Sequence, residues 1–351
     1  MTCTAVTVQR SYNYGSFLQA YALATTLRER FGKPVEFAEF GARSISQQGF
    51  RRVLGHIKRG NFSNVPFELS KMRALDKELA CLEETPLKRS YAPDDLLLFG
   101  SDEIWNLKRS EFSKYPQFWG ENLTSGNRAA YAVSANGALD DKKNIPEGFK
   151  RSIRSFDLLS ARDLSTKSAL EVLSGRDVEL VCDPTLLLDC DYYRTVQEPT
   201  TLSGDYILVY SYGLRIPKEA VAKIVSYAHA NGLTLVSPGF CLDWCDKCLP
   251  VSAFGFLGLM DSAQAVVTDT FHGTLFSTIY RKRFVSFSGG AEKVRDHLVR
   301  GGLSDRDGSF ENPVAILGVE PDYRVFNETS ADLVASSNDY LKRCLVLIEE
   351  H

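Results

Sequence analysis

The stretch VVTDTFHGTLFSTIYRKRF, residues 266–284, contains the change of pattern that decides the fold. It opens with three β-branched residues, which are typical of a buried strand, and its apolar run Leu275–Tyr280 has the spacing of a helix. Between the two lie Asp269–Gly273, which include His272, one of five histidines in the chain. A strand that leads directly into a helix is the repeating unit of a parallel α/β sheet. The stretch therefore predicts an α/β fold with a histidine at the carboxyl end of a strand.

The same alternation extends over almost the whole chain. Strand-like runs occur at 4–8, 34–40, 96–100, 129–135, 157–162, 178–183, 205–213, 233–239, 263–269 and 283–288. Helical spacing occurs at 17–31, 164–174, 218–231 and 330–350, and residues 51–61 and 67–82 form a basic and helical insertion between early strands. The series is interrupted after Pro184 by the polar run Arg194–Gly204. We therefore expect two Rossmann-like doubly wound domains that face each other across a cleft, at 1–190 and 191–329, followed by a C-terminal helix at 330–351.

Composition excludes several classes of protein. The chain has 351 residues, 44% of them hydrophobic and 24% charged, which is ordinary for a globular protein. Its net charge of −3 gives no attraction to nucleic acid, and no apolar run is long enough to span a bilayer. The first residues, MTCTAVTVQRSYNYG, lack the pattern of a secretory signal. We expect a cytoplasmic protein; docking at the inner face of the membrane, to a membrane-bound assembly, is left open.

Three cysteines, Cys241, Cys245 and Cys248, have the C-x3-C-x2-C spacing of radical-SAM iron–sulfur sites, and with a fourth ligand they could also hold zinc. They lie in the second half of the chain, whereas the radical-SAM loop comes early in a (β/α) barrel. The default interpretation is a cysteine-rich loop without metal.

Polar motifs follow the predicted strands, where open α/β sheets bind their ligands. The segment Ser11–Ser16 follows the first strand and opens a helix, with Gly15 suited to a positive φ and Asn13 or Ser16 suited to cap the helix. A helix N-terminus here would accept a phosphate or carboxylate. A capped turn without a ligand is the alternative.

The segment Gly100–Asn106 follows the apolar run 96–100. Asp102 can accept hydroxyl protons and Trp105 can stack on a sugar, which suits a sugar-facing site. The alternative places Asp102 as a helix cap and Trp105 in the core.

Two further motifs carry a cation and the histidine. Arg162, in SARD, can form a forked contact with a carboxylate or phosphate, or a salt bridge to Asp163. His272 lies where its imidazole can face a cleft, beside a helix N-terminus that would hold an anion. Of the cations downstream, Arg295 is the one most suited to the site.

In this order, NYGSFLQAYAL, GSDEIWN, SARD, CDPTLLL and TDTFHGTLF resemble the polysaccharide pyruvyl transferase family, from about residue 5 to about residue 305. The resemblance implies two Rossmann-like domains similar to those of GT-B glycosyltransferases, with the acceptor on the first and the donor on the second. It also implies transfer of the pyruvyl group of phosphoenolpyruvate to two hydroxyls of a sugar, with formation of a cyclic ketal and release of phosphate.

The resemblance suggests roles for the candidate residues. His272 would be the general acid or base, and Asp102 a base or a sugar-positioning group. The donor would be bound by Arg162, Thr270, Gly273, Thr274 and Arg295, and the acceptor by Asn13, Tyr14, Gly15, Ser101 and Trp105. No metal and no cofactor beyond phosphoenolpyruvate would be needed, and the acceptor would be lipid-linked, nucleotide-linked or an oligosaccharide.

The chain departs from the family pattern at one position. Family members carry an Arg-x-His pair, but Thr270 stands two residues before His272, which resembles a distinct TDTFHGT-type branch. A donor-binding arginine would then be Arg162, Arg283 or Arg295, or the substrates differ. The alternative functions are a GT-B glycosyltransferase that uses a nucleotide sugar, and a redox or metal module built on the three cysteines.

Overall fold

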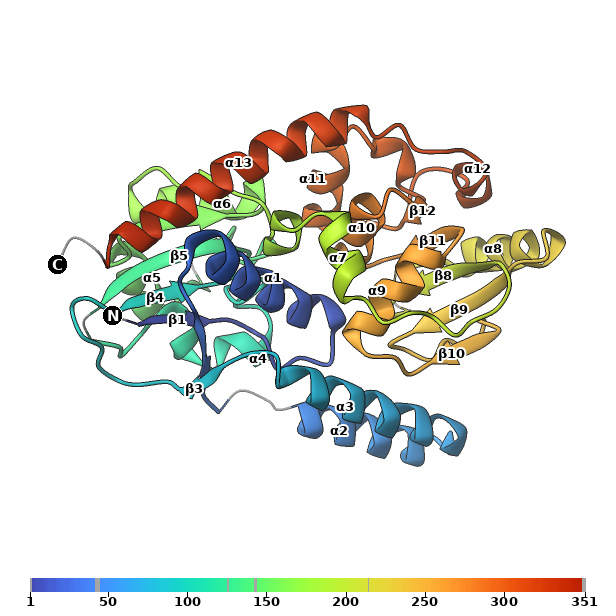
Figure 1. Cartoon of the computed structure of the whole chain (residues 1–351), viewed down its shortest axis with the longest axis horizontal. Coiled ribbons are helices and arrows are strands. Elements are labelled where there is room, and N and C mark those ends of the chain that lie inside the picture. The colour runs from blue at the N-terminus through green and yellow to red at the C-terminus, as the bar shows by residue number, and fades with distance from the viewer. Residues whose placement is uncertain (1, 42–44, 125, 142–143, 214, 349–351) are drawn as a thin grey trace.

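The computed structural model describes residues 2–41, 45–124, 126–141, 144–213 and 215–348, and it contains two parallel sheets (Figure 1). The first sheet has the order β3-β2-β1-β4-β5-β6-β7 and the second the order β10-β9-β8-β11-β12, so each is doubly wound about its first strand. The predicted pair of Rossmann-like sheets is confirmed.

The strands of the first sheet are β1 (Cys3–Val6), β2 (Glu36–Glu39), β3 (Glu84–Pro86), β4 (Leu96–Phe99), β5 (Asn127–Val133), β6 (Leu158–Ala161) and β7 (Glu179–Leu180). Those of the second are β8 (Tyr206–Tyr210), β9 (Thr234–Pro238), β10 (Lys247–Leu249), β11 (Ala265–Thr268) and β12 (Arg283–Ser286). The helices are α1 (Tyr14–Phe31), α2 (Ile45–Lys58), α3 (Val65–Leu79), α4 (Ser110–Ser113), α5 (Glu147–Arg154), α6 (Leu164–Ser174), α7 (Cys190–Val196), α8 (Lys218–Ala230), α9 (Ala253–Ser262), α10 (Phe271–Ile279), α11 (Glu292–Arg300), α12 (Pro313–Leu317) and α13 (Arg324–Val346). Short 3-10 turns include η1 (Phe62–Asn64) and η4 (Pro184–Leu187).

Strands β3 and β10 are absent from the expectations drawn from the sequence. Both are edge strands of three residues with no apolar run. An edge strand pairs on one side only and can remain partly solvated, so it need not be apolar. Central strands such as β4 are buried on both faces: Leu96 and Leu98 join one hydrophobic cluster, and Leu97 and Phe99 join another.

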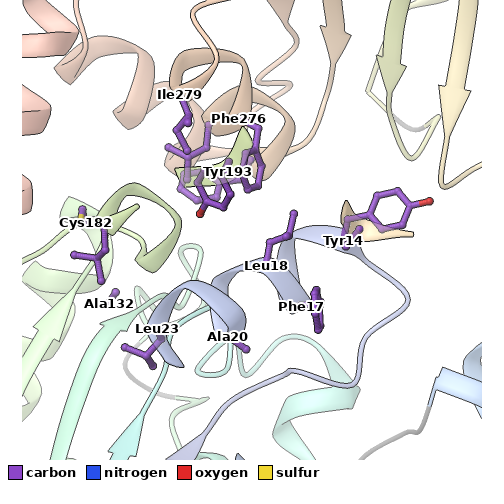
Figure 2. Close-up of a cluster of buried hydrophobic side chains, with 14 of the residues drawn as sticks. Tyr14, Phe17, Leu18, Ala20, Leu23, Ala132, Cys182, Tyr193, Phe276 and Ile279 are labelled. Carbon is purple, nitrogen blue, oxygen red and sulfur yellow. The ribbon is translucent and has the colours of Figure 1, made fainter. Parts of the chain in front are cut away.

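The larger cluster continues from one domain into the other. Figure 2 shows Leu18 of α1 facing Tyr193 of α7 and Phe276 of α10. The aromatic ring of Tyr14, at the start of α1, stacks against those of Tyr210 and Phe256 in the second domain, at 5.8 and 5.3 Å between centroids. This shared core fixes the relative position of the two sheets.

Helix α13 crosses from the second domain back to the first, as its place in Figure 1 shows. The ring of Phe326, near its start, packs against His297 of α11. Near its end, the Tyr340 hydroxyl donates to the Ala130 carbonyl of β5 and Ser337 accepts from the Cys182 amide, both at 2.8 Å. In the part of the chain that the structure describes, no helix has the length and apolar character needed to cross a bilayer.

The insertion α2–α3 joins the first domain to the second through Glu78. This buried carboxylate accepts hydrogen bonds from the Ala253 and Phe254 amides at the start of α9, at 2.9 and 2.8 Å. Burial raises the pKa of Glu78 to about 7, even though the two amides favour its charged form.

The stability of the fold should therefore change with the titration of Glu78. The folded pKa lies above the unfolded value near 4.5. The stabilisation from this bound proton is thus complete below about pH 4.5 and lost as the pH rises through 7. Relative to Glu78→Gln, the unfolding free energy of the wild type should fall by up to about 3 kcal/mol between these pH values, measured by urea unfolding. A difference that is flat or increases with pH would contradict this assignment.

Candidate active site

A cavity of about 780 Å³ lies between the two domains, at the carboxyl ends of both sheets. Its lining comes from the loops after β1, β4, β8, β9 and β11 and from helices α2, α3 and α11. The polar and charged side chains that line it include Asn13, Ser16, Arg52, His56, Arg59, Asp102, Glu103, Arg109, Tyr212, Arg215, Thr270, His272 and Lys293. This is the position at which the topology of open α/β sheets predicts a ligand site.

A buried chain of charges underlies the cavity. The Arg162 guanidinium lies 2.5 Å from Asp183 and 3.2 Å from Asp102; Arg162 and Asp183 are almost inaccessible, and Asp102 lines the cavity. The Nε2 atom of His272 lies 3.7 Å from the same Asp183 carboxylate, which is an electrostatic contact rather than a hydrogen bond. The guanidinium therefore ties a carboxylate of the cavity wall to the carboxylate behind the histidine.

The positive charges of this buried cluster keep its carboxyl groups ionised. Burial alone would raise the pKa of Asp102, but Arg162, His272 and Lys293 hold it below its ordinary value. Against the same effect of burial, His272 and Arg162 hold the pKa of Asp183 well below its usual range. Asp183 is also fixed by the Thr185 amide and hydroxyl, at 3.0 and 2.7 Å. The fixed Asp183 carboxylate therefore places a negative charge 3.7 Å from the imidazole of His272.

The start of α10 positions His272. Thr270 is the N-cap, and its hydroxyl accepts from the Gly273 amide at 2.9 Å. The Thr274 hydroxyl donates to the Thr270 carbonyl at 3.0 Å. A Cβ on Gly273 would lie 2.1 Å from the Thr268 hydroxyl, so this position requires glycine. Gly273 and Thr274 thus build the turn, while Thr270 and His272 line the cavity.

Gly15 lies against the imidazole of His272. A Cβ at this position would lie 2.1 Å from both Cγ and Nδ1 of the ring. The predicted positive φ at Gly15 is wrong, because Gly15 belongs to α1 and is not among the glycines with positive φ. Glycine is needed here because α1 of the first domain approaches the histidine of the second.

Asn13, the N-cap of α1, also joins the two domains in the cavity wall. Its side-chain oxygen accepts from the Gly15 amide at 3.0 Å and from the Tyr210 hydroxyl at 2.7 Å, and its amide donates to the Tyr212 hydroxyl at 2.5 Å.

Three residues predicted to face the acceptor lie inside the protein. Trp105 is completely buried in the first domain, where its indole donates to the Phe118 carbonyl at 2.9 Å, so it offers no face to a sugar. The Ser101 hydroxyl donates to Gln19 at 3.0 Å. The Tyr14 hydroxyl donates to the Val251 carbonyl at 2.8 Å. The sequence alone could not reveal these contacts, because each partner belongs to a different element of the fold.

The arginines predicted to bind the donor also lie outside the cavity lining. Arg162 is occupied by two carboxylates, and its role here is to position them. Arg295 is exposed on α11 and is not part of the cavity lining. Arg283 pairs with Glu320, at 2.9 Å, away from the lining.

The structure brings other cations to the cavity. Arg215 follows β8 and donates to the Asp269 carbonyl at 3.1 Å, one residue before Thr270. Lys293 of α11 reaches across the cleft to Glu103, a pairing that holds the pKa of Glu103 well below its ordinary value against the opposing effect of burial. Arg215 could have been found from the sequence, because it is a cation that follows the strand-like run 205–213. Lys293 could not be found in this way, because it lies in a helix and does not follow a strand.

The three cysteines of the C-x3-C-x2-C motif differ in their state: two are bonded to each other and Cys245 is free. Cys241 and Cys248 form a disulfide, so two of the three thiols proposed as metal ligands are occupied in this structure. Within the described ranges, no group of three or more His, Cys, Asp or Glu side chains is arranged to hold a metal ion.

Two doubly wound sheets that meet at their carboxyl ends over a cavity give this chain a GT-B-like fold. Solved structures with this arrangement include S. aureus MnaA with UDP (11% identity, 97% of this chain and 96% of that chain, TM-score 0.50). Another is the Methanocaldococcus jannaschii UDP-GlcNAc 2-epimerase (12% identity, 97% of this chain and 100% of that chain, TM-score 0.49). A third is E. coli heptosyltransferase WaaC (12% identity, 82% of this chain and 88% of that chain, TM-score 0.40).

The sequence identifies the family more narrowly than the fold does. The profile of the polysaccharide pyruvyl transferase family matches residues 13–290, so this chain belongs to that family. No curated protein sequence matches it.

The close approach of Gly15 to His272 can be tested by Gly15→Ala. The added methyl group must displace the imidazole, and overpacking of this kind costs about 1–3 kcal/mol of unfolding free energy. The His272 ring resonances in NMR spectra should shift as well. In the matched control Gly318→Ala, the nearest atoms lie 3.6 Å from the new Cβ, and little change is expected. Equal stability of the two variants, with an unmoved His272, would contradict the packing described here.

Proposed function

We propose that this protein transfers the pyruvyl group of phosphoenolpyruvate to two hydroxyls of a sugar in a surface polysaccharide or its precursor. The product is a cyclic ketal, and phosphate is released. Membership of the family supports the proposal. The observation that carries it is that His272, backed by Asp183, and Asp102 line the same cavity together with arginine and lysine side chains.

The reaction sets clear requirements for the site. In the first step a sugar oxygen bonds to C2 of phosphoenolpyruvate, the hydroxyl gives up its proton, and the methylene carbon gains one. Phosphate then leaves with the electrons of the C2–O bond, and a second hydroxyl bonds to C2. The second proton leaves with phosphate. The site therefore needs a group that moves protons near neutral pH and cations for two acidic groups of the donor.

His272 suits the transfer of protons. It borders the cavity, its side chain is of the type that most often moves protons in enzymes, and the ionised Asp183 lies 3.7 Å behind it. Asp102 is a weak base because its pKa is depressed. Its oxygens already accept from the Ser16 hydroxyl at 2.6 Å and from Arg162. We therefore assign Asp102 to orienting the sugar hydroxyls rather than to taking their protons.

Arg215 and Lys293 are the cations that we assign to the donor; unlike Arg162 both line the cavity, and Lys293 would share its charge between Glu103 and the donor. Arg215 lies beside the segment that carries Thr270 and His272, so it can replace the arginine of the Arg-x-His pair. Lys293 lies 5.3 Å from the ring centroid of Phe271, the neighbour of His272. A carboxylate and a phosphate held by these two cations would place C2 of the donor close to the imidazole. The acceptor would then lie toward Asn13 and Asp102 of the first domain.

Replacement of His272 tests the proton-transfer step. His272→Ala should lower the rate of phosphate release from phosphoenolpyruvate by about 10²- to 10⁴-fold over a panel of sugar acceptors, with the fold intact. With the wild type, mass spectrometry of the sugar should show a net gain equal to pyruvic acid less one water. His229→Ala is the control, because His229 lies on α8 and pairs with Asp246 away from the cavity. No phosphate release by the wild type, with turnover of a nucleotide sugar instead, would replace the proposal with a glycosyltransferase.

The donor site is tested by comparison of arginines. Arg215→Ala should raise the KM for phosphoenolpyruvate by about 10- to 100-fold, since it removes a charge-assisted hydrogen bond. Arg283→Ala and Arg295→Ala should leave this KM unchanged, because neither side chain lines the cavity. An increase for Arg295→Ala but not for Arg215→Ala would reverse the assignment.

A further inference from the structure

Helix α2 exposes an apolar stripe to solvent. Phe50, Leu54 and Ile57 are 60%, 40% and 42% exposed, and Phe62, just beyond the helix, is 65% exposed. The spacing of four and three residues places the first three on one face of the helix. Figure 1 shows the α2–α3 hairpin at the edge of the molecule, clear of both sheets.

This stripe is not required for the fold. The face of α2 next to the stripe holds the helix in place: Val53 is buried, and a Cβ on Gly49 would meet Met72 of α3 at 2.7 Å and Tyr12 at 3.3 Å. The hairpin is tied to the second domain as well, because the buried Nζ of Lys71 donates to the Gly239 carbonyl at 2.6 Å. The exposed apolar side chains are thus presented by a fixed helix.

The same segment is strongly basic. Between Ile45 and Asn64 the sequence contains Arg51, Arg52, Lys58 and Arg59 and no acidic residue, whereas the whole chain carries a net charge of −3. A helix with exposed Phe, Leu and Ile on one face and Arg and Lys beside them is typical of helices that lie in the interface of an anionic bilayer. The charge of this surface complements anionic lipid and opposes attraction to basic partners.

We propose that α2 docks the protein on an anionic lipid surface, with Phe50, Leu54, Ile57 and Phe62 inserted among the lipids. The side chains of Arg51 and Lys58 project about 100° around the helix axis from the stripe, where they would contact lipid phosphates. Arg52 and Arg59 project about 200° around the axis from the stripe, on the nearly opposite face, and line the cavity. The basic face of α2 thus leads from the lipid surface into the site.

This arrangement favours a lipid-linked sugar as the acceptor, an inference that rests on the proposed function. A sugar attached to a lipid through phosphate would keep its lipid in the bilayer, its phosphate on the basic face of α2 and its hydroxyls near His272 and Asp102. Arg52 is already ordered for this task, since its guanidinium lies 4.5 Å from the ring centroid of Phe240 and 3.6 Å from Glu68.

Docking is tested without substrates, by flotation of the purified protein with vesicles. Vesicles that contain phosphatidylglycerol should carry the protein, pure phosphatidylcholine vesicles should not, and salt should weaken the binding. The double variant Phe50→Asp/Leu54→Asp should reduce binding more than about tenfold. Arg51→Gln/Lys58→Gln should reduce it about 25-fold, from about a factor of five for each cation.

The matched control is Val172→Asp/Phe310→Asp, which makes the same change at exposed apolar residues far from α2 in the chain. It should bind vesicles as the wild type does. A wild type that does not float, or a control that is equally impaired, would overturn the proposal. A dimer in solution that Phe50→Asp/Leu54→Asp converts to a monomer, without vesicle binding, would assign the stripe to a second copy of the chain instead.

The acceptor class is tested separately. Phe50→Asp/Leu54→Asp should lose turnover of a lipid-linked sugar in vesicles and retain turnover of a soluble acceptor, because neither residue lines the cavity. Equal loss on both acceptors would overturn the inferred class. Vesicle binding without any pyruvyl transfer would leave docking in place and remove the proposed function.

Discussion

The buried guanidinium of Arg162 is the interaction on which the rest of the site depends. It lies between Asp102, after β4, and Asp183, in the turn that leads toward the second domain. The ring of Phe271 lies 4.6 Å from it, so the second domain closes over the same cation. Because an unpaired buried carboxylate is costly, each of these charges is stable only while the others are in place. Loops from both domains are therefore held in one arrangement around His272.

The contacts between the domains have the same consequence on a larger scale. The core around Leu18, Tyr193 and Phe276 is continuous across the two sheets, and α13 binds the strand β5 after it leaves the second domain. Glu78 holds the start of α9. Each contact comes from a different element, so the cavity between the domains has a defined shape before any ligand binds. Pre-organisation of this kind reduces the cost of ordering a site when the substrate arrives.

The candidate site could be predicted in part. His272, Asp102 and Asn13 were found because they follow strands, and the carboxyl ends of parallel strands meet at one edge of a sheet. The same rule fails for Trp105 and Tyr14, which also follow strands but point into the core. It fails for Lys293 because a helix, not a strand end, brings it to the cavity. Whether a side chain faces solvent or core depends on what packs against it, and the sequence pattern does not contain that information.

The sequence by itself determined the two α/β domains and the family. Apolar periodicity reports which faces of strands and helices are buried, and five ordered motifs are specific enough to identify a family. Only the tertiary structure decided that Arg162 holds two carboxylates rather than a substrate, and that Gly15 makes room for an imidazole. These assignments depend on distances between residues far apart in the chain. Such distances are set by the packing of whole elements, which no local pattern of residues records.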